Sequence, residues 1–99
     1  MSDASAGTVI FHNQGGFDCS FSIQWDGGET GRTEILSIGQ TTTLDLRRYA
    51  NLSPGTSCWA RGYVYGGPNH DSGRNFNYDP NGGSVDYTIS GGTLNPSFN

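Results

Sequence analysis

Apolar and polar residues alternate along most of this chain, and that alternation limits its possible folds more than any other feature. It is clearest in residues 19–25, where every second position is apolar: Cys19, Phe21, Ile23 and Trp25. Side chains of a β-strand point alternately to the two faces of a sheet, so this pattern predicts a strand with one buried face. No stretch keeps the period of an amphipathic helix, about 3.6 residues. We therefore expect an all-β protein.

About seven to eight short strands are predicted, separated by turns rich in glycine, proline and asparagine. They fall at Thr8–His12, Cys19–Trp25, Thr33–Ile38, Thr41–Leu46, Ser57–Tyr65, Asn75–Tyr78 and Ser84–Ser90, with a short one around Thr93–Leu94. Such spacing is typical of an antiparallel sandwich or a compact barrel. A chain of 99 residues has room for one core. The prediction is a small antiparallel β-sandwich that forms a single domain over residues 1–99.

Side-chain parity in the fifth predicted strand separates a core face from an outer face. The small side chains share one parity: Cys58, Ala60, Gly62 and Val64. If this set faces the core, Cys58 points inward, just as parity predicts for Cys19. The two cysteines could be buried thiols, but inward cysteines on different strands of a small sandwich can reach bonding distance. We expect a Cys19–Cys58 disulfide, worth about 4 kcal/mol. The remaining predicted core residues are Leu36, Ile38, Leu44, Leu46, Val85, Tyr87 and Ile89.

The other parity of the same strand gives the candidate binding site. It carries Trp59, Arg61, Tyr63 and Tyr65 away from the core. Exposed aromatic rings are costly in water and stack well on the apolar faces of sugars. The segment Gly66–Asn75 follows at once and is interpreted as a polar loop. The predicted carbohydrate-binding residues are Trp59, Arg61, Tyr63, His70, Asp71, Arg74 and Asn75. The alternatives are a face packed on a second sheet and a solvated hairpin tip.

The sequence contains none of the common catalytic templates, and we expect a protein that is not an enzyme. It has no nucleophile elbow, no phosphate-binding glycine loop and no dinucleotide fingerprint. Nothing in the sequence gives His12 or His70 a nucleophile and an orienting acid. A carboxylate pair such as Asp26 and Asp71 would need a deeper cleft than so short a chain builds. The segment Asp79–Gly83 lacks calcium-loop spacing and is interpreted as a turn. No metal or cofactor is expected.

The charge pattern disfavours several partners. The formal net charge is −4, there is no lysine, and the arginines are scattered, so neither nucleic acid nor an anionic membrane surface is expected. No apolar run is long enough to span a bilayer, so membrane insertion is not expected. The first seven residues lack the features of a signal peptide. We expect a cytoplasmic protein, released by an unconventional route if it acts outside the cell. If Met1 was placed before a mature terminus, the protein is secreted.

Four segments are similar to small single-domain lectins from mushroom fruiting bodies: Asn13–Phe17, Ser37–Gln40, Ser57–Ala60 and Ser90–Phe98. The resemblance implies a β-sandwich, a cytosolic fungal defence protein, glycan binding without catalysis and often a homodimer. The expected function is therefore that of a lectin for cell-surface or glycoconjugate glycans. Two alternatives stay open. One is a small defence or virulence toxin acting on membranes or host receptors. The other is a protein-interaction module whose aromatic stripe is an interface.

Overall fold

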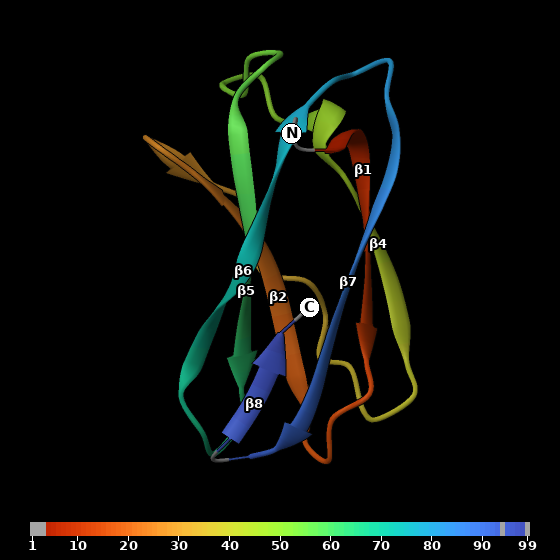
Figure 1. The fold of residues 1–99 in the computed structure, drawn as a ribbon, viewed down its shortest axis with the longest axis vertical. Helices are drawn as coiled ribbons and strands as arrows, with labels where there is room; N and C mark the ends of the chain where they lie inside the picture. The colour runs from red at the N-terminus through yellow and green to blue at the C-terminus, as the bar shows by residue number, and fades with distance from the viewer. Residues whose placement is uncertain (1–3, 94, 99) are drawn as a thin grey trace.

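The computed structural model describes residues 4–93 and 95–98, and strands make up most of them (Figure 1). The strands are β1 (Ala4–Asn13), β2 (Cys19–Trp25), β3 (Gly28–Glu29), β4 (Thr41–Asp45), β5 (Ser57–Val64), β6 (Asn69–Tyr78), β7 (Gly83–Gly92) and β8 (Asn95–Phe98). One 3-10 turn, η1 (Leu46–Arg48), follows β4. The all-β prediction is confirmed. Over the same residues, no helix has both the length and the apolar character needed to cross a membrane.

The strands lie in two layers, and β1 pairs with strands of both (Figure 1). One layer contains β3, β2, β5 and β6, which pair antiparallel in that order. The other contains β4, β1, β7 and β8. β1 runs parallel to β6 at residues 4–6 and parallel to β7 from Ala6 onward. The sheet is thus mixed, although the sequence pattern suggested a wholly antiparallel one.

Gly7 is the point at which β1 changes partner. The β1–β7 register shifts between Ala6 and Thr8, on either side of it. A residue with a side chain would clash at this position, because a Cβ on Gly7 would lie 2.9 Å from the carbonyl oxygen of Asp79. An irregularity of this kind bends a strand and re-aims it. β1 can therefore pair with β6 of one layer and with β7 of the other, which joins the two layers around one core.

Buried aromatic rings from both layers fill the space between them. Phe11 of β1 stacks on Phe21 of β2, with ring centroids 4.6 Å apart and planes 8° from parallel. Tyr87 of β7 contacts both Phe11 and Phe76 of β6. All four are completely buried. Each contributes about 1.5–3 kcal/mol by burial, so these rings largely hold the layers together.

The predicted Cys19–Cys58 disulfide is wrong. Both thiols are free. Both are also buried, as parity predicted for side chains on the inward faces of β2 and β5. However, the β2–β5 register pairs Cys19 with Val64 and Cys58 with Trp25. The cysteines thus sit at opposite ends of the strand pair, about 20 Å apart at about 3.3 Å per residue, whereas a disulfide needs Cα atoms within about 7 Å. Burial raises the pKa of Cys19 to about 12 and that of Cys58 to about 11.

The predicted strand Thr33–Ile38 is instead part of an irregular extended segment, residues 30–38, that covers the edge of β2. Its backbone meets β2 only at every third residue, where the amides of Thr30, Thr33 and Leu36 donate to β2 carbonyls. The hydroxyls of these two threonines, Thr33 and Thr30, accept hydrogen bonds from β2 amides. A regular neighbouring strand would offer backbone carbonyls instead. Ile38, assigned to the core from the sequence, is 63% exposed at the end of this segment.

Candidate functional site

The outer face of the β2–β5–β6 layer holds most of the predicted site. Parity is confirmed for β5, because Cys58, Ala60 and Val64 lie in the core. The alternate positions form what we call the β5 outer row: Trp59, Arg61 and Tyr63. The register places this row between Ser20, Ser22 and Gln24 of β2 on one side and Asn69, Asp71 and Asn75 of β6 on the other. The accessible part of this face comes from β5 and β6, because the β2 side chains on it are buried.

Asp71 organises the centre of this surface. Its Oδ1 accepts from Arg61 Nε at 2.6 Å, and its Oδ2 accepts from a second Arg61 nitrogen at 3.1 Å. The indole N–H of Trp59 donates to the same carboxylate at 3.3 Å. The hydrogen bond from Arg61 holds the pKa of Asp71 below its usual value, and the pair raises the pKa of Arg61. We call these three residues the Asp71 cluster. They present an aromatic ring beside fixed polar groups.

Tyr63 lies in the predicted position but is not an open platform. It is only 8% exposed. Its hydroxyl lies 3.0 Å from Ser22 Oγ, which accepts a further hydrogen bond from Gln24 Nε2. The guanidinium of Arg32 covers the ring, with its Cζ 3.8 Å from the ring centroid. No sugar can stack on this face while Arg32 stays in place. Parity cannot reveal a residue that reaches over from an irregular neighbouring segment.

The predicted polar loop Gly66–Asn75 is wrong, because β6 begins at Asn69. The β5–β6 register shifts where Ser72 Oγ accepts from the Ala60 amide at 3.0 Å. Beyond this bulge, Arg74 turns toward the other layer. It stacks on Tyr87 and donates to the backbone carbonyl of Asp86.

The remaining two predicted β6 residues divide between the faces. Asn75 stays on the outer face, opposite Trp59, and donates to Ser57 Oγ at 3.0 Å. His70 pairs with Gly62, so alternation directs it away from the face that carries Asp71. The structure therefore gathers Trp59, Arg61, Asp71 and Asn75, with Tyr63 beneath Arg32, and it separates His70 and Arg74 from them.

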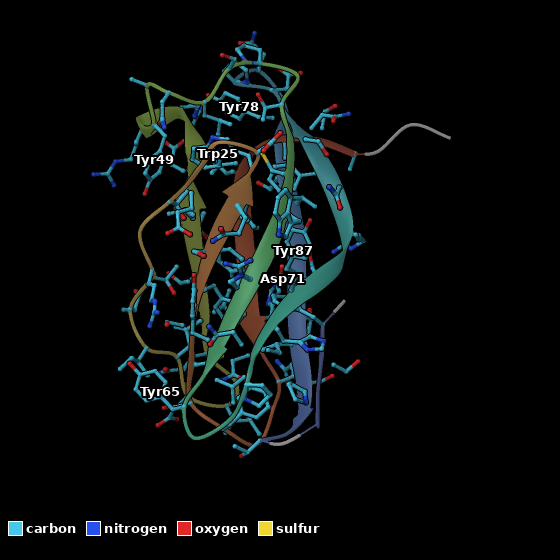
Figure 2. All side chains as sticks on the ribbon, turned by 90° about the vertical axis from the view of Figure 1, so that its left-hand side faces the viewer. Trp25, Tyr49, Tyr65, Asp71, Tyr78 and Tyr87 are labelled. Atoms are coloured by element: carbon cyan, nitrogen blue, oxygen red, sulfur yellow. The ribbon has the colours of Figure 1, made fainter. Side chains whose placement is uncertain are left out.

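A second feature, which the sequence did not single out, lies at one end of the sandwich. Three turns meet there, and we call them the glycine tip: residues 14–18, 65–68 and 91–93. The Gly16 amide donates to the Gly91 carbonyl at 3.0 Å, and the Tyr65 amide donates to the Asp18 carbonyl at 3.0 Å. Gly66 and Gly91 adopt positive φ angles of 81° and 92°, which favour glycine. Figure 2 shows Tyr65 at this end, far from Trp25 and Tyr49.

The exposed large apolar side chains belong to the end of the molecule that carries the glycine tip. Among the residues described, the large hydrophobic side chains classed as exposed are Ile35, Ile38 and Tyr65, at 50%, 63% and 52%. Ile35 precedes Leu36, which bridges to Cys19 at the start of β2. Ile38 precedes Gly39, whose amide donates to Asn13 at the end of β1. All three positions therefore belong to the end of the molecule where the three turns meet.

His12 has partners that the sequence could not supply. Its Nε2 lies 3.0 Å from Asp86 Oδ2 and its Nδ1 lies 3.2 Å from Thr41 Oγ1. The three side chains come from β1, β7 and β4 and lie on the solvent side of that layer. We assign them a role in joining these strands. Within residues 4–93 and 95–98, no three His, Cys, Asp or Glu side chains group as metal ligands.

Comparison with known proteins gives a likeness of fold. No protein-family model matches the chain, and no curated protein matches it. Among solved structures, listeriolysin O aligns with a TM-score of 0.51 at 16% identity and pneumolysin with 0.51 at 17%. Each alignment covers 94% of this chain and 22% of the lysin. The chain thus spans about a fifth of the length of these proteins and shares the fold of that part.

Proposed function

We propose that this domain is a non-catalytic recognition module that attaches to a membrane surface through its glycine tip. The observation that carries the proposal is that the exposed Ile35, Ile38 and Tyr65 belong to the same end of the molecule. Tyrosine and aliphatic side chains favour the membrane–water interface, where a ring can bury its body and keep its hydroxyl in water. The fold shared with part of two proteins named as lysins supports the same choice.

The expected attachment is weak and peripheral. Full burial of a large apolar side chain is worth about 1.5–3 kcal/mol, and each of these three is roughly half exposed. Together they could contribute about 3 kcal/mol, which holds a protein on a surface reversibly. With a formal net charge of −4 and no lysine, the domain should favour zwitterionic over anionic lipid.

Vesicle flotation tests this proposal. The purified domain is mixed with vesicles of phosphatidylcholine, of phosphatidylcholine with phosphatidylserine, or of a total membrane lipid extract. The wild type should float with the first and third and less with the second. Combining Ile38→Ser with Tyr65→Ser should weaken binding by about 2 kcal/mol, roughly thirtyfold. Ile10→Ser, on the outer face of the other layer, is the control. The proposal fails if nothing floats or if the double variant floats like the wild type.

A second candidate function, glycan binding, is favoured by the Asp71 cluster. Sugar sites combine an aromatic face with a few fixed hydrogen-bonding groups. Here the indole of Trp59 is held beside a carboxylate that is 44% exposed and whose geometry is fixed by Arg61. A glycan array with the wild type and with Trp59→Ala tests this candidate. Binding that survives Trp59→Ala would contradict a site on this cluster.

A further inference from the structure

The arginines of this chain differ in what their guanidinium groups contact. Arg47 pairs with Asp45, and Arg61 pairs with Asp71. Arg32 has no hydrogen bond and no carboxylate partner within the residues that the structure describes; its contact is the ring of Tyr63. Its planar group is therefore held in place while its N–H donors stay available.

The position of Arg32 follows from the segment that covers β2. The Thr33 amide donates to the Phe21 carbonyl at 2.8 Å, and the Phe21 amide donates to Thr33 Oγ1 at 3.0 Å. Arg32 is thus fixed beside the edge of β2, while Tyr63 lies on the next strand, β5. To reach that ring, the Arg32 side chain crosses the outer face of β2. The buried hydroxyls of Ser20 and Ser22 belong to this face.

The chemistry around Arg32 suits an anion. A guanidinium fork matches a carboxylate with two parallel hydrogen bonds, and stacking on an aromatic ring orients it for that contact. The nearest carboxylate in sequence, Glu34, instead accepts from Thr42 Oγ1 at 3.0 Å. Beside Tyr63 in register, Ser20 Oγ is buried with no hydrogen-bond partner. Arg32 therefore offers N–H donors to solvent above Tyr63, and the unpaired Ser20 hydroxyl lies buried beside that ring.

We propose that Arg32, stacked on Tyr63, anchors the carboxylate of an acidic sugar on the solvent side of its guanidinium. The inference rests on glycan binding by the Asp71 cluster and names its substrate class. Tyr63 and Arg61 are alternate residues of β5, so the two sites lie about 7 Å apart on one face, a span that a sugar and its substituents can bridge. Arg61 balances the charge of Asp71, which leaves Arg32 to receive the carboxylate while Asp71 accepts sugar hydroxyls.

Two monosaccharides that differ only at one carbon provide the test. Glucuronate and glucose are titrated into the ¹⁵N-labelled domain, and amide shifts are followed. Glucuronate should bind at least tenfold more tightly than glucose and should shift amides around Arg32 and Tyr63. Arg32→Gln should weaken glucuronate at least tenfold, and Arg32→Lys should weaken it less. Arg48→Gln removes the same charge from an exposed arginine on η1 and should change nothing.

The proposal is overturned by no glucuronate binding, by equal binding of glucose, by unchanged binding to Arg32→Gln, or by equal losses in Arg32→Gln and Arg48→Gln. Acetate is titrated in parallel, and binding as tight as that of glucuronate would refute a sugar site in favour of a simple anion site. Thermal melts show that each variant is folded. If glycan-array binding depends on Trp59 while glucuronate fails, glycan binding stands and the acidic-sugar assignment falls.

Discussion

Replacing Gly67 by alanine tests whether the glycine tip is assembled by close backbone packing. Gly67 lies in the turn between β5 and β6, and a Cβ built there would overlap the carbonyl oxygen of Thr93 and come within 3.1 Å of a Val64 methyl. The first of these atoms is backbone and belongs to the turn between β7 and β8. One turn must therefore move away from the other to admit a single methyl group.

The expected cost is that of overpacking, about 1–3 kcal/mol. For a domain of this size, each kcal/mol changes the melting temperature by about 4–8 °C, so Gly67→Ala should lower it by about 4–24 °C. Gly73 provides a matched control, because a Cβ there meets no atom within 4 Å and its φ is not positive. Gly73→Ala should stabilise the domain by about 0.4–1 kcal/mol, since alanine restricts the unfolded chain.

Differential scanning calorimetry on the wild type and both variants measures these shifts. Vesicle flotation of Gly67→Ala at a temperature where it is fully folded then reports on the tip itself. A variant whose turns have moved apart should bind vesicles less well than Gly73→Ala does. If Gly67→Ala melts at or above the temperature of Gly73→Ala, the close approach of the two turns is not a real feature of the folded protein.

Three further predictions concern the cysteines and the candidate site. Because burial raises the pKa of Cys19 and Cys58, neither thiol should react with iodoacetamide at pH 8 in the folded protein, and both should react in denaturant without reductant, as intact mass will show. Because the Arg61 hydrogen bond lowers the pKa of Asp71, this carboxylate stabilises the fold above its unfolded pKa, about 3.9, and the contribution is lost as pH falls through the lower folded value. Asp71→Asn should therefore flatten the dependence of melting temperature on pH below about pH 4, and an unchanged acid limb would contradict the ion pair. Trp59→Ala should keep the wild-type circular dichroism spectrum, because this side chain lies outside the core; unfolding of the variant would place it in a second core.

The sequence predicted the parts of this fold that depend on alternation. The inward and outward residues of β2 and β5 lie on the faces that parity assigned. Alternation does not fix which residues of two neighbouring strands lie opposite each other, and the disulfide prediction failed for that reason. The register between strands comes from turns and neighbours that a pattern of period two leaves unspecified.

The candidate site was predicted where it lies within one strand and missed where it depends on contacts between segments. Trp59 and Arg61 were found because they share a parity on β5. The loop assignment failed because glycine and asparagine in β6 suggested a turn, whereas pairing with β5 makes a strand. Arg32 was missed because its contact with Tyr63 crosses an intervening strand. Ile38 was placed in the core with Leu36 because the two alternate in a predicted strand, and the structure has an irregular segment there.

The parallel pairing of β1 with β7 has a consequence for how the chain folds. Thr8 pairs with Ser84 and Asn13 with Ile89, so the contacts that close the sandwich join residues separated by most of the sequence. Proteins dominated by such distant contacts fold slowly, in milliseconds to seconds, because a long loop must be ordered before the contact forms. During synthesis, β1 leaves the ribosome first but has no β7 to pair with until residue 89 has emerged. Until then, the β7-facing edge of β1 is unpaired, and a nascent chain is open to pairing with other strands.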